Sequence, residues 1–99
     1  MIKHVVLFKF KSEVELSKNK EKLKNIKVLL EKLKGHINCL SFIEVGLNSN
    51  PSEAYDLSLI TEFETWDDLK AYVVHPEHQK VAAIIRETLD QRACVDYEF

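Results

Sequence analysis

The sequence has few of the residues that interrupt or cross-link a chain. Among its 99 residues are only two Gly, two Pro and two Cys. This composition excludes collagen-like chains and disulfide-rich scaffolds, and a hydrophobic share of 45% also excludes a disordered chain. The length fits one domain over residues 1–99. A domain this small buries a modest core, so a partner subunit would add stability.

Targeting and cross-linking signals are also scarce. No apolar run approaches the roughly 20 residues that a membrane-spanning helix needs. Residues 1–7 enter a strand pattern directly, without the long apolar region or the cleavage site of a signal peptide. Cys39 and Cys94 lack the paired spacing of metal ligands, which favours free thiols. We therefore expect a cytoplasmic protein that contacts no membrane.

Positive charge is concentrated in the first third of the chain. The net charge is −2, but residues 1–34 hold ten Lys and four Glu, whereas residues 35–99 hold four Lys or Arg and twelve Asp or Glu. The basic part could suggest nucleic-acid binding. Its lysines, however, share a helical pattern with an apolar face and have no aromatic residues between them. We expect a solvated helix face and no nucleic-acid partner.

Alternation of apolar residues predicts four strands. The first covers residues 2–10, and the others cover about 40–47, 55–63 and 93–99. One face of the first strand carries Ile2, His4, Val6, Phe8 and Phe10. The turn residues at 48–52 make the second and third strands an antiparallel hairpin. The first strand also has Val5 and Leu7 on its other face. A sheet surface in contact with solvent would not need apolar residues there, so we expect this face to be covered as well.

The remaining segments have helical periodicity. A long helix follows Ser12 or Ser17, either of which could cap it, and ends at about Lys34. Thr65 is expected to cap a second helix. The apolar side of that helix would comprise Trp66, Leu69 and Val73, with Tyr72 beside them.

Pro76 divides the second helical region. Proline disfavours helical geometry at the preceding His75 and fits the first position of a new helix, which we expect to run to about Leu89. The resulting β-α-β-β-α-β order predicts a ferredoxin-like α+β sandwich with an antiparallel four-stranded sheet. The sheet face that the helices leave bare would pair with a second copy, which gives a homodimer and a dimeric α/β barrel.

Three stretches resemble those of a known family. Residues 4–10 resemble the opening strand of the stress-responsive A/B barrel domain (Dabb) family, residues 72–78 its helix-breaking motif, and residues 95–97 its closing strand. The resemblance covers essentially the whole chain. It implies a dimeric α/β barrel with small-molecule-sized pockets between sheet and helices, and functions that are mostly unassigned.

The resemblance also implies candidate site residues. A plant polyketide cyclase in this family closes a linear polyketide by an aldol condensation without a metal or an organic cofactor. Its catalytic tyrosine and histidine match Tyr72 and His78, and its pocket histidines match His4 and His75. The aromatic residues that hold its substrate are replaced here by Val81, Ile84 and Leu89, so its substrate does not carry over.

The residues themselves support these roles but leave alternatives. His78 would be the third residue of its helix, where the helix dipole disfavours imidazolium and keeps a general base neutral, or it could make a structural hydrogen bond. Tyr72 could stabilise an enolate, or bond a backbone partner. His4 could be a satisfied core residue, and His75 an N-cap or hinge. The expected pocket wall also includes Val6, Phe8, Leu59 and Val81.

These features allow three functions. The first is cofactor-free acid/base chemistry on a carbonyl or polyketide-like substrate, and the second is non-catalytic, stress-associated binding. The third is a haem-degrading or cofactor-free monooxygenase, suggested by Trp66 near His75 and His78 but opposed by the lack of an asparagine in the first strand. The histidine spacing across Pro76 does not match a zinc motif, so no metal is expected.

Overall fold

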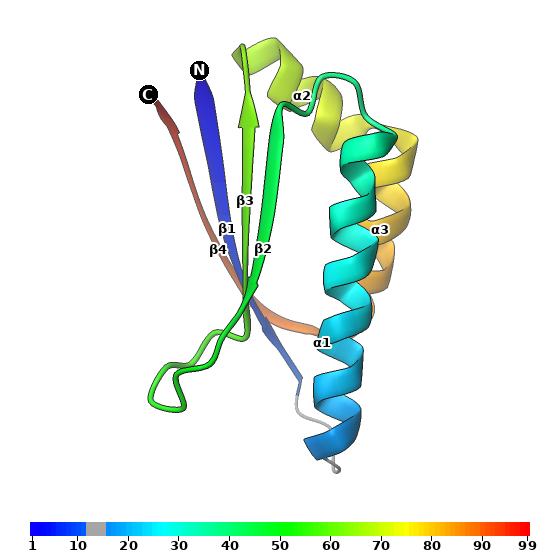
Figure 1. Ribbon diagram of the computed structural model, residues 1–99, viewed down its shortest axis with the longest axis vertical. Coiled ribbons are helices and arrows are strands. Elements are labelled where there is room, and N and C mark those ends of the chain that lie inside the picture. The colour runs from blue at the N-terminus through cyan, green and yellow to red at the C-terminus, as the bar shows by residue number, and fades with distance from the viewer. Residues whose placement is uncertain (12–15) are drawn as a thin grey trace.

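The computed structural model describes residues 1–11 and 16–99, and the side chains from residue 19 onward in the second range (Figure 1). The elements follow one another in the order β1 (Ile2–Phe10), α1 (Leu16–Glu31), a 3-10 turn η1 (Lys32–Gly35), β2 (Phe42–Leu47), β3 (Leu57–Phe63), α2 (Trp66–Val74), α3 (Pro76–Thr88) and β4 (Leu89–Glu98). This order is the predicted one.

The four strands form one antiparallel sheet in the order β2-β3-β1-β4. The sheet confirms the ferredoxin-like prediction. β1 lies in the interior of the sheet and pairs with β3 along one edge and with β4 along the other. β2 and β4 are the outer strands. Cys39 precedes one of them and Cys94 lies within the other, and both are free thiols.

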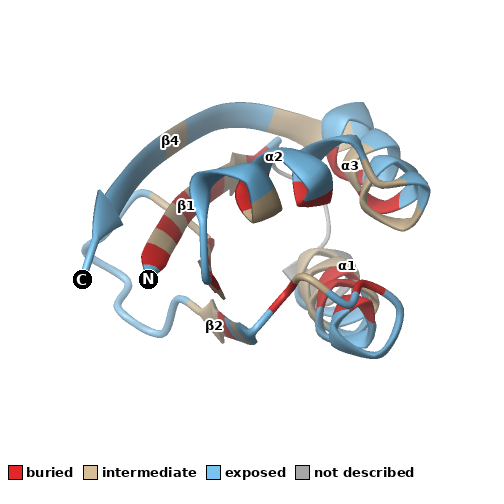
Figure 2. Ribbon diagram, turned by 90° about the horizontal axis from the view of Figure 1, so that it is seen from above, coloured by how far each residue is buried: buried red, intermediate tan, exposed pale blue. Residues whose placement is uncertain are grey.

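The helices cover one face of the sheet, and the core lies between the two layers (Figure 2). Every second residue of β1 and β3 is buried, as expected for strands with one face toward the core. α1 contributes Ile26 and Leu30 to this core, and α3 contributes Val81 and Ile85. Burial of these apolar side chains is the main force that holds the helices on the sheet.

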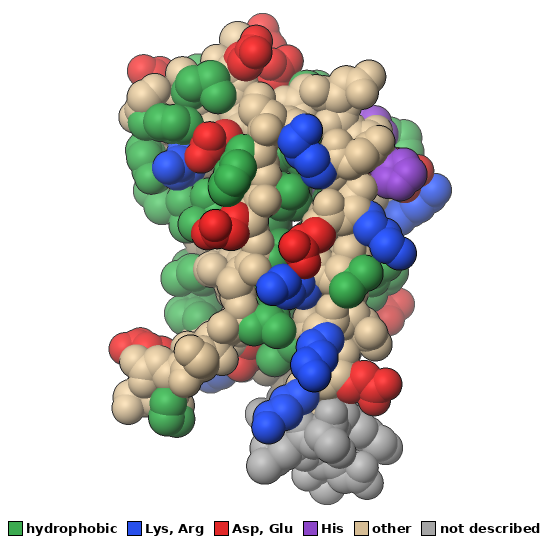
Figure 3. All heavy atoms as spheres, in the orientation of Figure 1, with side chains coloured by type: hydrophobic (Ala, Val, Ile, Leu, Met, Phe, Trp, Pro, Cys, Tyr) green, Lys and Arg blue, Asp and Glu red, His purple; other side chains and the backbone are tan. Residues whose placement is uncertain are grey.

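The opposite face of the sheet is apolar and partly open. Val5, Leu7 and Ile60 are half-buried there, and they lie beside Val95 and Tyr97, which are 57% and 44% exposed. Hydrophobic side chains gather on the side of the molecule away from the helices, whereas lysines and arginines are spread over the helical side (Figure 3). This open face is the one predicted to pair with a second copy.

Several boundaries differ from the predicted ones. β4 begins at Leu89 rather than near residue 93, because it pairs with β1 along its full length. β2 and β3 each begin two residues later than expected, and α1 ends at Glu31, where the 3-10 turn takes over.

Two helix features also need correction. The buried side of α2 consists of Leu69 and Tyr72, while Trp66 and Val73 are each 41% exposed. Ser17 is already helical and therefore does not cap α1, and Ser12 lies outside the described residues. The predicted cap at Thr65 is confirmed, since its side chain accepts a hydrogen bond from the Asp68 amide at 3.1 Å. Within the described ranges, no helix is long and apolar enough to cross a membrane.

Candidate functional site

A cavity of about 300 Å³ lies between the sheet and the helices. This volume is at the lower end of the range for small-molecule sites. Most of the predicted site residues line it, namely His4, Val6, Phe8, Leu59, Tyr72, His78 and Val81. The others that line it are Leu30, Ala82, Ile85, Arg86, Leu89 and Arg92. His75 and Trp66 are not among the lining residues.

Tyr72 is fully buried near the end of α2. Its ring packs against Phe63 and His78, with ring centroids 5.0 Å and 4.5 Å away, and His4 lies edge-on to it at 6.5 Å. The hydroxyl oxygen has no hydrogen-bond partner among the described residues. Burial raises the pKa of Tyr72, so the phenol stays protonated and can act only as a neutral donor or acceptor.

His78 enters the same cavity from the first turn of α3. Pro76 begins that helix, because its fixed backbone angle suits the first helical position and its missing N–H is not needed there. Nδ1 of His78 is also buried without a hydrogen-bond partner in the described part of the chain. The Val73 carbonyl lies close enough to His78 to favour the protonated ring, and it also accepts a hydrogen bond from Gln79 Nε2 at 2.8 Å.

The pKa of His78 is lowered. Burial is the main cause, and the nearby His4, Arg86 and Arg92 side chains add to it, while the Val73 carbonyl acts in the opposite direction. A neutral imidazole at neutral pH is what a general base requires.

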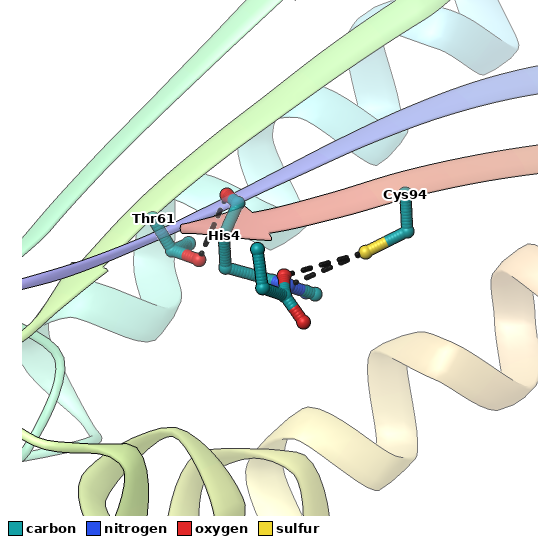
Figure 4. A network of polar contacts seen from close by, with 4 residues as sticks. His4, Thr61 and Cys94 are labelled. Carbon is teal, nitrogen blue, oxygen red and sulfur yellow. Dashed lines mark hydrogen bonds and ion pairs between the residues drawn. The ribbon is translucent and has the colours of Figure 1, made fainter. Parts of the chain in front are cut away.

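His4 is held by β4. It lies directly opposite Asp96 in the β1–β4 register, and its Nδ1 is hydrogen-bonded to the Asp96 carboxylate. Cys94 Sγ lies 3.5 Å from that nitrogen and 3.4 Å from Asp96 Oδ1 (Figure 4). A carboxylate at Nδ1 fixes the ring orientation and leaves Nε2 for other contacts. Thr61 Oγ1 donates to the His4 carbonyl at 3.4 Å from the other neighbouring strand.

Among the described residues, one group of side chains could hold a metal ion, and it consists of His4, Cys94 and Asp96. The His4 nitrogen, the Cys94 sulfur and an Asp96 oxygen all lie within 4.8 Å of one another. A thiol binds metal as the thiolate. Burial, followed by the Asp96 carboxylate, raises the pKa of Cys94 and opposes that form. The hydrogen bond between His4 and Asp96 accounts for their close approach without an ion.

His75 has a structural position. It is the residue between α2 and α3, and its Nδ1 accepts a hydrogen bond from the Glu77 amide at 3.1 Å. It therefore caps α3, as one of the two sequence interpretations proposed, and it fixes the break that turns His78 toward the cavity. The ligand contact that the other interpretation gave it finds no support in its position.

Sequence reasoning missed Arg86, Arg92 and Asp96. The predicted strand begins at residue 93, so Arg92 falls in the connection before it and the direction of its side chain is not predicted. In the structure β4 begins at Leu89 and includes Arg92. Continuing the alternation of Cys94 and Asp96 back by two residues would have put Arg92 on the helix-facing side. Arg86 is one turn after Ala82 in α3, on the side that meets the sheet.

The fold and the cavity define a ferredoxin-like α+β protein with a pocket between its sheet and helices. The chain belongs to the stress-responsive A/B barrel domain family, Dabb, whose sequence profile matches residues 2–99. This confirms the resemblance noted in the sequence.

Three relatives illustrate the family relationship. A dimeric ferredoxin-like protein of unknown function from Bacteroides fragilis shares 43% identity, with a TM-score of 0.92 over 99% of this chain and 95% of that one. A dimeric ferredoxin-like protein of unknown function from Thermobifida fusca shares 25% identity, with a TM-score of 0.84 over 99% and 90%. An uncharacterised protein of Streptomyces coelicolor is 34% identical over the full length of both chains.

Proposed function

We propose that the cavity is a small-molecule site in a homodimer, and that His78 and Tyr72 perform cofactor-free acid/base chemistry there on a carbonyl compound. A fold of this kind hosts many functions, so the argument rests on the site. A cytoplasmic location belongs to the same proposal and is supported by the two free thiols.

One observation carries the proposal. The Tyr72 hydroxyl and His78 Nδ1 are the two buried side-chain polar atoms without a hydrogen-bond partner in the described part of the chain, and both belong to residues of the same cavity. A buried polar group without a partner costs about 1–3 kcal/mol. A fold that keeps two of them on side chains whose rings pack together is best explained by a ligand that pairs with them.

The chemistry follows from their protonation states. Neutral His78 removes a proton from the carbon next to a carbonyl group, and becomes imidazolium. The electron pair of the broken C–H bond forms a carbon–carbon double bond. The π electrons of the carbonyl move to its oxygen, and the product is an enolate. Tyr72, still protonated, donates a hydrogen bond to the enolate oxygen. The imidazolium then returns its proton to the α-carbon, or to the alkoxide that forms when the enolate carbon attacks a second carbonyl group, and His78 becomes neutral again.

The proposed dimer uses the open face of the sheet. That face presents Val5, Leu7 and Val95, and a contiguous apolar surface of this kind on a small protein indicates an interface. The relatives from Bacteroides fragilis and Thermobifida fusca are described as dimeric. A two-fold axis through this face would close the barrel.

A non-catalytic binding protein is the second candidate. The cavity volume supports it as well as the enzyme, since about 300 Å³ admits a small ligand whether or not a reaction follows. The haem-binding alternative loses its support, because Trp66 is exposed and its indole nitrogen donates to Glu98 Oε1 at 3.0 Å, outside the cavity lining.

Exchange of the α-proton tests the catalytic step directly. A panel of β-keto esters and β-keto acids is incubated in D₂O, and loss of the α-proton signal is followed by NMR. We expect the protein to accelerate exchange for at least one compound, and His78→Ala and Tyr72→Phe to remove the acceleration. His36→Ala, an exposed histidine outside the cavity, serves as the matched control. Equal rates for the parent and both site variants would exclude the enzyme.

A further inference from the structure

The chain has two arginines, Arg86 and Arg92, and both line the cavity. Its other twelve basic residues, histidines aside, are lysines. Arg86 comes from the last turn of α3 and Arg92 from β4, so two separate elements bring guanidinium groups to the same wall. Arg86 alone would be explained by the negative end of the helix dipole. Arg92 lies in a strand and has no such explanation.

Neither arginine forms an ion pair with a carboxylate of the described residues. The ion pairs among the described residues involve Lys3, Lys9, Lys80 and His4, and no carboxylate lies within 4 Å of either guanidinium group in that part of the chain. Arg92 instead contacts the Cys94 thiol, whose pKa is raised by burial and by Asp96 and is lowered in part by Arg92. Both arginines are exposed, so the cavity carries two positive charges on its solvent-facing side, beside an apolar wall that includes Val6, Leu59 and Val81.

We infer that the cavity binds an anionic ligand, with a carboxylate held by Arg86 and Arg92 and an apolar body that extends toward Tyr72 and His78. This inference rests on the proposed small-molecule site and names the class of ligand. A guanidinium group presents its N–H donors in a planar fork that matches a carboxylate. A cavity of about 300 Å³ limits the apolar body to one ring or a short chain.

The arginines would also assist the proposed reaction. Removing a proton from a carbonyl compound that already carries a carboxylate creates a second negative charge on the same small molecule. Beside the apolar side chains of the cavity wall, this repulsion is stronger than in bulk water. Two guanidinium groups that neutralise the carboxylate reduce that cost, so an acidic substrate would be deprotonated more readily than its amide.

Two compounds that differ in charge distinguish the contribution of the carboxylate to binding from that of the apolar body. Binding of 4-phenylbutanoate and of 4-phenylbutanamide is measured by titration calorimetry at neutral pH, with the ring signals of His78 followed by NMR. The proteins are the parent, Arg86→Gln, Arg92→Gln and the double variant. Lys70→Gln is the matched control, because Lys70 is an exposed cation of α2 that does not line the cavity.

We expect the parent to bind the carboxylate roughly tenfold more tightly than the amide, and this preference to weaken as salt is added. Each single variant should lose part of the preference for the carboxylate, and the double variant should lose all of it, without a change in the affinity for the amide. Lys70→Gln should show the same preference as the parent. Equal affinity of the parent for the two compounds would overturn the inference, as would an equal loss for both in the double variant.

Failure of the underlying proposal gives a different result. If the amide binds and shifts the His78 signals, the small-molecule site stands whatever the carboxylate does. If neither compound binds and the His78 signals do not move, both the anion preference and the small-molecule site are wrong for ligands of this size. Thermal melts of every variant confirm that the fold is intact.

Discussion

Tyr72 and His78 lie ring to ring across the break at Pro76, with centroids 4.5 Å apart, and neither the Tyr72 hydroxyl nor His78 Nδ1 has a partner among the described residues. Two such groups side by side are a cost to the fold. The two polar atoms therefore do not help to stabilise the fold, which favours a role for them in ligand binding or catalysis. Both residues can be tested for each role independently.

Tyr72→Phe should leave stability unchanged or higher. The substitution keeps the ring that packs against Phe63 and removes a hydroxyl that has no partner in the described structure, so we expect the free energy of unfolding to stay the same or to rise by up to about 1–3 kcal/mol. Tyr72→Ala should cost about 3–5 kcal/mol, because it removes a fully buried ring. Urea unfolding at a fixed protein concentration measures both. A large loss for the phenylalanine variant would show that the hydroxyl is structural.

His78 should make the protein less stable in mild acid. Burial lowers the folded-state pKa below the ordinary value of about 6.5, so the unfolded chain takes up the proton more readily than the folded one. The contribution of neutral His78 to the free energy of unfolding is complete above about pH 6.5. It is lost as the pH falls through the pKa of His78 in the folded state. We expect unfolding experiments between neutral pH and pH 5 to show a greater loss for the parent than for His78→Gln.

The exposed His36 provides the control for that experiment. His36→Gln should follow the parent, since its ring lies in the solvent after the 3-10 turn. Other groups that titrate in the same interval affect parent and variants alike and cancel in the comparison. Parallel pH curves for the parent and His78→Gln would show that His78 is not held neutral by the fold.

His75 should matter for folding rather than for ligand binding. Its Nδ1 caps α3 through the Glu77 amide, so His75→Ala should lower the free energy of unfolding by about 1 kcal/mol. His75→Asn should restore most of this loss, because asparagine is a good N-cap residue. Ligand titrations should give the same affinity for all three proteins. Weaker binding by the folded asparagine variant would instead assign His75 to the site.

Val95→Glu should dissociate the dimer. Val95 lies opposite Val5 on the open sheet face, where a carboxylate would be buried against the partner's apolar surface. Val74→Glu is the matched control, because Val74 is 70% exposed at the end of α2. Analytical ultracentrifugation should find the control dimeric and the Val95 variant monomeric. A dimer that survives the Val95 substitution would place the interface elsewhere.

The sequence by itself determined the elements and their order. Local signals were strong where one face is buried and the other is not, as in β1, whose alternation was read correctly from Ile2 to Phe10. Thr65 and Pro76 marked helix starts through their own backbone preferences, which depend little on the rest of the chain. These signals were enough to predict the order of the elements along the chain and an antiparallel four-stranded sheet with one bare face.

Tertiary structure decided how the site residues meet. The buried side of α2 was misjudged because Trp66, Leu69 and Val73 form a good apolar stripe, yet Tyr72 packs inward against Phe63 from β3. The start of β4 depends on how far it pairs with β1, and no pattern within residues 89–92 alone records the extent of that pairing. Only this pairing brings Asp96 to His4 and turns Arg92 toward the cavity.

The stretch from Tyr72 to His78 shows both contributions together. Its composition and its proline identified Tyr72 and His78 from the sequence, because helix geometry and titratable groups are local properties. The absence of hydrogen-bond partners in the described residues, and the charge that surrounds the cavity, depend on atoms from β1, α3 and β4. Burial and electrostatic fields are sums over neighbours in space, so they exist only once the chain has folded.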